Sequence, residues 1–225
     1  MHNNKIILVV AAHADDEALG CAGTIARHTS LGDIVHVIFM TNGVGSRNDF
    51  SIKDIENRKI AAQKGADILG ISSVYNFDFP DNKMDSVPLL DIVKSIENKI
   101  QELKPEIIYT HYVGDLNIDH QMTHKAVITA CRPQPSFCVQ QIYSFEVPSS
   151  TEWSISSPFI PNYFIDISNT LELKMSAIRL YDSEFRAPPH ARSVESIKAL
   201  AQYRGMSVGM RLAEGFKIIR ILSHA

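Results

Sequence analysis

The sequence has little of what marks a secreted or membrane-spanning protein. Its three cysteines, Cys21, Cys131 and Cys138, are odd in number and follow no spacing pattern, so they support neither a disulfide framework nor a thiolate metal site. The apolar run at the N-terminus is far too short to cross a bilayer, and no signal-peptide cleavage pattern follows it. We therefore expect a soluble, cytoplasmic protein that does not insert into a membrane.

The chain also lacks a large excess of charge. Its formal net charge is -3 and it has no basic patch or tail, so we do not expect it to bind nucleic acid. What it does have is apolar content: 45% of its 225 residues are hydrophobic and 21% are charged. This composition is enough for one large core, and a single domain over residues 1–225 is the simplest organisation.

Apolar runs alternate with segments of helical periodicity in the first two thirds of the chain. The predicted strands are residues 5–12, 34–41, 73–79, 106–111 and 139–146, and the predicted helices are residues 16–29, 51–69, 87–103 and 119–131. Repeated strand–helix alternation is typical of βαβ units, which form a parallel sheet. The sequence thus predicts an α/β, Rossmann-like fold, with a mostly parallel sheet flanked by helices.

The pattern changes after residue 147. A Ser- and Pro-rich segment at 148–161 is predicted to be a long loop. It is followed by a short strand, two helices and a final strand, at residues 163–167, 170–183, 193–203 and 216–221. No polar linker, repeat or low-complexity segment divides the chain, so we interpret residues 1–147 as the core of one domain and residues 148–225 as its C-terminal elaboration.

Polar residues cluster directly after two of the predicted strands. AHADDE follows the first strand, and HYVGDLNIDHQMTH begins at the end of the fourth. In an open parallel sheet, ligands bind beyond the carboxyl ends of the strands, so the fold should bring both clusters to one rim. Four charged or imidazole groups within five residues would repel one another or need joint desolvation, which is costly unless a ligand neutralises them.

Imidazole and carboxylate groups without thiols suit Zn²⁺ or another borderline divalent ion. His13 and Asp16 are close enough in sequence to bind one ion from a single turn, and His120 could supply a third ligand. Three protein ligands leave a position open for water, which is typical of a catalytic zinc. Asp15 could then accept a proton from that water; in the alternative, Asp15 and Asp16 only cap a helix.

His124 stands four residues after His120, the spacing of the two histidines in zinc peptidase helices. The glutamate base of that motif is missing, because Gln121 stands in its place. We interpret His124 as a surface residue or a support for the ligands. Asp119 is a natural carboxylate partner for a ligand histidine, or a cap for its helix.

Together, AHADDE and DLNIDHQMTHKAV resemble the patterns AH(P/A)DDE and HPDH of the zinc-dependent deacetylases of the PIG-L/LmbE family. The resemblance implies a hydrolase that removes an N-acetyl group from an N-acetylglucosamine-containing substrate, with a zinc-bound water as the nucleophile. It also assigns roles to individual residues: zinc ligands His13, Asp16 and His120, general base Asp15, and substrate-binding Arg58.

One departure from the family pattern concerns Asn117, which stands where HPDH has its first histidine. An amide can donate a hydrogen bond to an oxyanion, but it cannot exchange a proton near neutral pH. Asp15, or His111 at the end of the fourth strand, would then protonate the leaving group. We predict that Asn117 is an oxyanion donor and His111 a second catalytic candidate; the alternative for Asn117 is that it shapes the turn before the helix.

Three residues are candidates for substrate binding. They are Arg58, whose alternative is an exposed helix charge, Asp115, and Trp153, which could stack on a sugar or lie in a subunit interface. We expect the partner to be a small N-acetylated sugar or sugar conjugate. We also expect a homo-oligomer, with the Pro-rich connector at 186–190 packing between subunits.

Two other functions are compatible with parts of the sequence. A nucleotide-sugar-binding or transferase module on a Rossmann-like sheet would need a glycine fingerprint in the first βα turn, where this chain has acidic residues instead. A metal-binding homologue with impaired catalysis would explain Asn117 but not the retained Asp15. The leading interpretation is a zinc-dependent N-acetylglucosaminyl-type deacetylase, an amidohydrolase.

Overall fold

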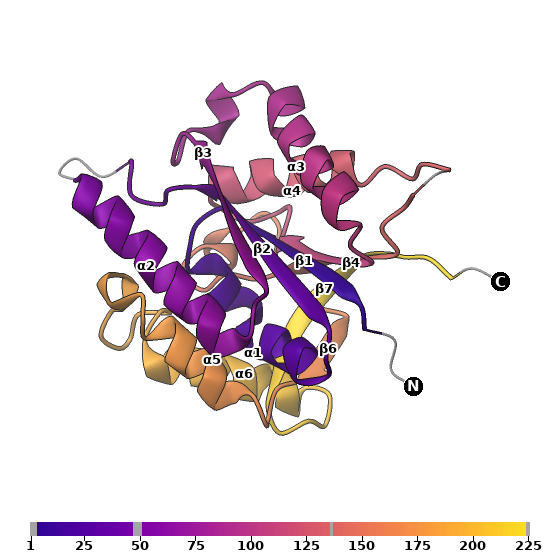
Figure 1. Cartoon of the computed structure of the whole chain (residues 1–225). Coiled ribbons are helices and arrows are strands. Elements are labelled where there is room, and N and C mark those ends of the chain that lie inside the picture. The colour runs from indigo at the N-terminus through magenta and orange to yellow at the C-terminus, as the bar shows by residue number, and fades with distance from the viewer. Residues whose placement is uncertain (1–3, 47–50, 136, 224–225) are drawn as a thin grey trace.

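The computed structural model describes residues 4–46, 51–135 and 137–223 and places a seven-stranded sheet at the centre of the molecule (Figure 1). The strands lie in the order β3-β2-β1-β4-β5-β7-β6. Their bounds are β1 Ile6–Ala11, β2 Ile34–Thr41, β3 Ser73–Phe79, β4 Ile107–His111, β5 Gln141–Phe145, β6 Tyr163–Asp166 and β7 Ala213–Ile221.

The first five strands are parallel, as the alternating pattern predicts. From β1 the chain builds outward through β2 and β3 and then crosses to β4 on the other side of β1. This reversal makes the carboxyl ends of β1 and β4 the topological switch point of the sheet, where open α/β proteins bind their ligands. The last strand, β7, is antiparallel to both of its neighbours, β5 and β6.

Helices cover both faces of the sheet. Figure 1 shows α1, α2, α5 and α6 on one side of it and α3 and α4 on the other. Their bounds are α1 Asp16–Ser30, α2 Ile52–Leu69, α3 Leu89–Leu103, α4 Ile118–Ala130, α5 Leu171–Ile178 and α6 Val194–Met206, with single 3-10 turns η1 Met84–Ser86, η2 Thr151–Trp153 and η3 Asp182–Glu184. None of the helices in the described ranges is both long and apolar enough to cross a membrane.

Strand β1 is buried on both faces, which explains its unbroken apolar run. Ile7 and Val9 belong to the apolar cluster under α1, α2, α5 and α6, whereas Leu8 and Val10 belong to the cluster under α3 and α4. A strand between two cores is held rigidly, so the loop that follows it starts from a fixed point.

Helix α1 differs from the continuous helix that the sequence predicts. Its backbone leaves helical geometry at Cys21, with φ -149° and ψ 17°, so two helical segments meet at a kink. Two glycines beside the kink let the helix approach its neighbours closely: a Cβ on Gly20 or Gly23 would come within 3.0 Å of Phe145 or Ile167 respectively. Periodicity alone does not reveal such a break, because both segments keep an apolar face.

The C-terminal part also differs in detail from the prediction. The predicted helix over 170–183 ends at Ile178, and Tyr181 then turns into the core, where it is buried. The last strand begins at Ala213 rather than at Phe216, because Ala213 and Glu214 pair with Asp166 and Ile165 of β6. The early start of β7 places Glu214 inside the molecule.

Candidate metal and active site

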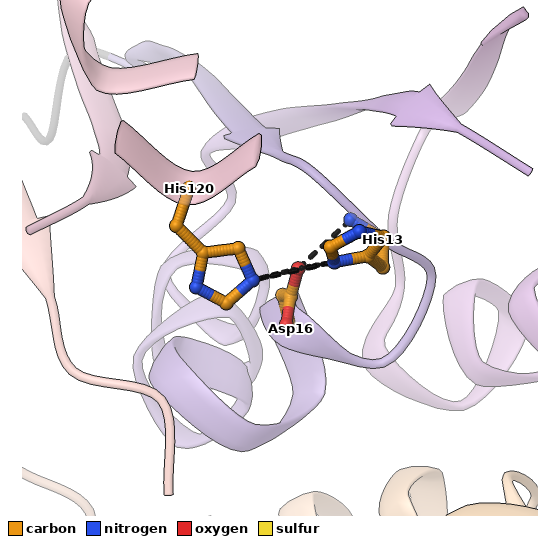
Figure 2. Close-up of side chains that lie close together, drawn as sticks. All are labelled: His13, Asp16 and His120. Carbon is orange, nitrogen blue, oxygen red and sulfur yellow. Dashed lines mark hydrogen bonds and ion pairs between the residues drawn. The ribbon is translucent and has the colours of Figure 1, made fainter. Parts of the chain in front are cut away.

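The switch point brings the two predicted clusters together, as Figure 2 shows. His13 lies in the loop after β1, Asp16 begins α1, and His120 projects from the first turn of α4. Asp16 Oδ2 lies 3.2 Å from His13 Nδ1 and 3.3 Å from His120 Nε2, and the two nitrogens are 3.3 Å apart. All three side chains are buried.

The donor atoms of this cluster fit a divalent metal ion. One ligand atom from each of His13, Asp16 and His120 lies within 4.8 Å of the others. Asp16 Oδ1 is buried and accepts no hydrogen bond from the part of the chain that the structure describes. Burial disfavours a charged imidazole at His120, but Asp16 and Asp115 outweigh it and raise its pKa to about 9. The negative field that attracts a proton to this ring would attract a dication as well.

Carboxylates stand behind both histidines. His13 Nε2 lies 3.1 Å from Asp119 Oδ2 and 3.3 Å from Asp81 Oδ1. Asp119 is fixed in turn by the backbone N–H groups of Asn82 and Met84, which donate to its two oxygens at 2.6 and 3.0 Å. A carboxylate at one ring nitrogen orients the imidazole and leaves the other nitrogen available as a ligand. Asp119 thus has the supporting place that the sequence suggests.

Asp115 lies beside Nδ1 of the candidate ligand His120. Its carboxylate is buried, lies 3.1 Å from His120 Nδ1, and accepts hydrogen bonds from the hydroxyls of Ser150 and Thr151 and from the backbone of Asn117. Burial opposes ionisation, but His120 and the hydroxyl donors outweigh it and lower the pKa of Asp115 to about 2. These contacts place Asp115 to orient His120, and its contact with a substrate stays a prediction.

Asp15 adopts an unusual backbone conformation. Its φ of 138° is one that side-chain-bearing residues rarely adopt, and strain of this kind costs on the order of 1–3 kcal/mol. Its N–H donates to Glu17 Oε2 at 3.0 Å, and the Tyr181 hydroxyl donates to Glu17 Oε1 at 2.8 Å. The Asp15 side chain makes no capping hydrogen bond to α1, so the capping alternative is wrong for this residue.

Two arginines hold the Asp15 carboxylate. Its Oδ2 lies 3.2 Å from Arg58 Nη2 and 3.0 Å from Arg192 Nη1, and both guanidinium groups also pair with Glu184. Burial raises the pKa of Asp15, and the two arginines act in the opposite direction. Arg58 is buried, so the exposed-charge alternative is wrong, and its contact with a substrate stays a prediction.

Arg192, Glu184 and Asp81 were not predicted as site residues. Arg192 reaches Asp15 across 177 positions in the sequence, and Glu184 comes from η3 in the same C-terminal part. Asp81 lies in a Pro-Asp-Asn turn after β3, where a carboxylate is ordinary. The strand-end rule could have found Asp81, because β3 is parallel to β2 and ends at the same edge.

Asn117 is engaged at both ends of its amide. Its Oδ1 accepts from the N–H groups of Asp119 and His120 at 2.8 and 3.3 Å and so caps α4, while its Nδ2 donates to Asn82 Oδ1 at 3.0 Å. These are the contacts of the turn-shaping alternative. A role as oxyanion donor would require Nδ2 to leave Asn82, and it stays a prediction.

His111 stacks against the candidate ligand His120, with ring centroids 3.9 Å apart. The backbone N–H of Ala12 donates to His111 Nε2 at 2.8 Å. Burial and the neighbouring His120 lower the pKa of His111 well below its usual value, which favours the neutral ring. These contacts fit a ring that supports His120, and the predicted proton transfer by His111 stays a prediction. His124 Nδ1 donates to the His111 carbonyl oxygen, 2.8 Å away, in keeping with a supporting role.

Trp153 lies on the surface in η2. Its side chain is half exposed, and its ring meets His190 edge-on with centroids 6.1 Å apart. Neither a sugar contact nor a subunit contact follows from this placement alone, so both remain open for this residue.

A family comparison bears directly on this cluster. The family model described as "PIG-L: GlcNAc-PI de-N-acetylase" matches residues 8–131, which is more than half of the chain and includes His13, Asp16 and His120. The chain belongs to the PIG-L family. The resemblance seen in the two sequence motifs is thereby confirmed, and residues 148–223 lie beyond the part of the PIG-L model that matches.

Individual relatives differ in their named activities. The chain is 26% identical to a diacetylchitobiose deacetylase of Thermococcus kodakarensis over 96% of this chain and 83% of that protein. It is 28% identical to a 4-oxalmesaconate hydratase of Pseudomonas putida over 78% of this chain and 72% of that protein. PIG-L family members of similar distance thus include a deacetylase and a hydratase.

A solved structure supports the architecture. The crystal structure of the conserved protein TT1542 from Thermus thermophilus superimposes with a TM-score of 0.79 and 25% identity, over 97% of this chain and 96% of that one. The match extends through the C-terminal part, so the predicted single α/β architecture with its mostly parallel sheet is confirmed.

Proposed function

We propose that this chain is a divalent-metal-dependent deacetylase, which hydrolyses the N-acetyl group of a small amino sugar or sugar conjugate. The observation that carries the proposal is the place of Asp15: a buried carboxylate in a strained backbone position, directly beside a cluster of two imidazoles and a carboxylate. The diacetylchitobiose deacetylase that aligns with 96% of the chain supports an N-acetylated sugar as substrate.

His13, Asp16 and His120 would hold the ion. Two imidazoles and one carboxylate form a catalytic zinc set, and zinc is the metal we propose. When bound there, a zinc ion supplies Lewis acidity, which polarises the amide carbonyl and lowers the pKa of a water molecule. The carboxylates of Asp119, Asp81 and Asp115 keep the two rings in the orientation that this requires.

Asp15 carries the proton transfers. It accepts a proton from the attacking water while the water oxygen bonds to the acetyl carbon, and it returns that proton to the nitrogen as the C–N bond breaks. The second proton of the water also ends on the amine, so the products are acetate and the protonated amine. Arg58 and Arg192 restrain the carboxylate for this task, and their positive charges favour its ionised form against the effect of burial.

The hydratase relative gives a second candidate function. A hydratase adds water across a carbon–carbon double bond and releases no second product. Two guanidinium groups beside the cluster, those of Arg58 and Arg192, favour this candidate, because arginine binds carboxylates well. Against it, both already pair with Asp15 and Glu184, so an incoming carboxylate would have to displace these partners.

An acetate-release screen tests the proposal. Metal-stripped and zinc-restored protein would be incubated with N-acetylated mono- and disaccharides and with acidic N-acetylglucosamine conjugates. We expect zinc-dependent acetate release that disappears in Asp15→Asn. A parallel assay follows the ultraviolet absorbance of conjugated dicarboxylates. A fall in this absorbance, with no acetate release from any sugar, would overturn the deacetylase proposal in favour of hydration.

A further inference from the structure

The break in α1 leaves backbone groups that a regular helix would pair with each other. In an α-helix the N–H of Gly23 would donate to the C=O of Leu19. Here the N–H groups of Gly23 and Thr24 donate instead to Glu214 Oε1 and Oε2, at 3.0 and 2.7 Å. The Leu19 carbonyl accepts from Lys174 Nζ at 2.7 Å. Two side chains thus take over the hydrogen bonds at the kink.

Those two side chains also pair with each other. Lys174 Nζ lies 2.6 Å from Glu214 Oε1, and the side chains of both residues are only 5% exposed. They reach α1 from α5 and β7, both of which follow residue 148. The result is a closed network in which a carboxylate caps the second segment of α1 and an ammonium group caps the end of the first.

Stability alone gives little reason for such a pair. A buried ion pair loses so much hydration that well-packed apolar residues of the same volume are often as stabilising or more so. The network does have a geometric effect, because it fixes where the first segment of α1 points. That segment begins with Asp16, and Asp15 precedes it. The hydrogen bond from the Tyr181 hydroxyl to Glu17, in the same segment, also comes from the C-terminal part.

We propose that Lys174 and Glu214 are positioning residues for the metal site. By bridging the two segments of the kinked α1, they hold the turn that carries Asp15 and Asp16 against His13 and His120. The inference rests on the metal site of the proposed function, but not on the identity of the substrate. Partners that orient metal ligands typically change metal affinity by about 10–100-fold when they are removed.

The chain offers a matched control in a second ion pair. Arg204 donates from Nε and Nη2 to Glu146 at 2.8 and 2.7 Å, and the two side chains are 15% and 14% exposed. This pair also joins the C-terminal helices to the sheet, but within the described residues it donates no hydrogen bond to α1. Its removal therefore tests the effect of losing a largely buried ion pair without disturbing the turn that carries Asp15 and Asp16.

The experiment compares Lys174→Met and Glu214→Gln with Arg204→Met. Zinc affinity is measured by competition with a chromophoric chelator, the absorption spectrum of the Co²⁺-loaded protein reports ligand geometry, and urea unfolding of chelator-treated protein reports stability. We expect Lys174→Met and Glu214→Gln to lose about 10–100-fold in zinc affinity and to shift the Co²⁺ spectrum. Arg204→Met should change stability alone. Glu214→Gln keeps the side-chain volume and one acceptor, so it serves if Lys174→Met does not fold.

Two results would overturn the inference. In one, Lys174→Met and Glu214→Gln are destabilised but bind zinc and Co²⁺ like the unaltered protein, which would make the ion pair purely structural. In the other, the unaltered protein binds no zinc. Zinc binding by the unaltered protein without acetate release would instead contradict the proposed function and leave the positioning role standing, so the two failures are distinguishable.

Discussion

The groups that hold the candidate ligands and Asp15 in place come from two different parts of the chain. His13, Asp16 and His120 all lie within the stretch that the family model matches, at the ends of two adjacent parallel strands. Arg192 and Lys174, which fix Asp15 and the turn after it, lie in the C-terminal part beyond that stretch. The matched part supplies the ligands in short motifs, together with supports such as Asp119 and Arg58. The C-terminal part adds further contacts to the same segment from positions that are distant in sequence.

This division has a physical basis. A parallel strand that is buried on both faces delivers its final residues to a fixed edge, so ligands that follow such strands need few local instructions. The segment that follows β1, however, contains the strained residue Asp15 and then the kinked helix α1. Such geometry persists only where surrounding contacts determine it. Arg58 provides one of these contacts, and Arg192 and Lys174 of the C-terminal part provide others. Each prediction below removes one side of the division and measures what the other side retains.

Loss of a ligand should have the largest effect. We expect His120→Ala to abolish metal binding and to reduce turnover to background, because two remaining ligands do not hold a catalytic ion. Metal content by elemental analysis and acetate release check this. His124→Gln, on the same helix, is the control and should keep its metal. A fully loaded His120→Ala protein would show that the ion is held elsewhere.

Replacement of Asp15 should separate binding from chemistry. Asp15→Asn keeps the shape of the side chain but cannot accept a proton, so we expect metal content to stay normal and kcat to fall by about 10²–10⁴-fold. Glu184→Gln is the matched control: it alters the arginine network around Asp15 but leaves the carboxylate itself, and its effect should be much smaller. If Asp15→Asn loses zinc, Asp15 is a ligand and the roles assigned to the two neighbouring acids are wrong.

Asn117 allows a cap and a catalytic donor to be told apart. Asn117→Ala should lower the free energy of unfolding by about 1 kcal/mol, because α4 loses its N-cap acceptor. Asn117→Asp keeps the acceptor and removes the amide donor, so its stability in urea unfolding should stay near that of the unaltered protein. Turnover of Asn117→Asp then decides the predicted oxyanion role. A fall of about 10²–10³-fold supports that role, and unchanged turnover reduces Asn117 to a helix cap.

Trp153 should give the smallest effect. If its exposed ring stacks on the sugar, Trp153→Ala should raise KM by up to about tenfold and leave kcat unchanged, in line with the energy of an aromatic contact. Steady-state kinetics and size-exclusion chromatography check this. An altered elution volume with unchanged KM would instead place Trp153 in an interface between subunits, as the expected homo-oligomer allows.

The strands and the three candidate ligands could be predicted because their signals are local. β1 to β5 are short apolar runs; AHADDE begins at the end of β1, and NIDH follows β4 after a short loop. The kink at Cys21 and the contacts of Arg192 could not be predicted in this way. Both depend on residues that become neighbours only in the folded chain, and neither leaves a periodic pattern.

Asp115 shows that a sequence can locate a residue without revealing what surrounds it. The sequence places it near the site, and the structure agrees. Its surroundings include Ser150 and Thr151 of the C-terminal part, whose hydroxyls donate hydrogen bonds to its carboxylate. From sequence alone a carboxylate at a strand end is open to a substrate as much as to a histidine, since the spacing says nothing about what covers it.

The place of β7 in the sheet has a consequence for the biogenesis of the protein. β7 pairs with β5 on one side and β6 on the other, yet it is made after both. A nascent chain therefore carries all three candidate ligands while the exposed edge of β5 still lacks its neighbour and the turn after β1 still lacks Glu214. Such an edge invites association with other chains. Competence to capture metal should thus arise late in synthesis, once residues 213–221 have left the ribosome and closed the gap.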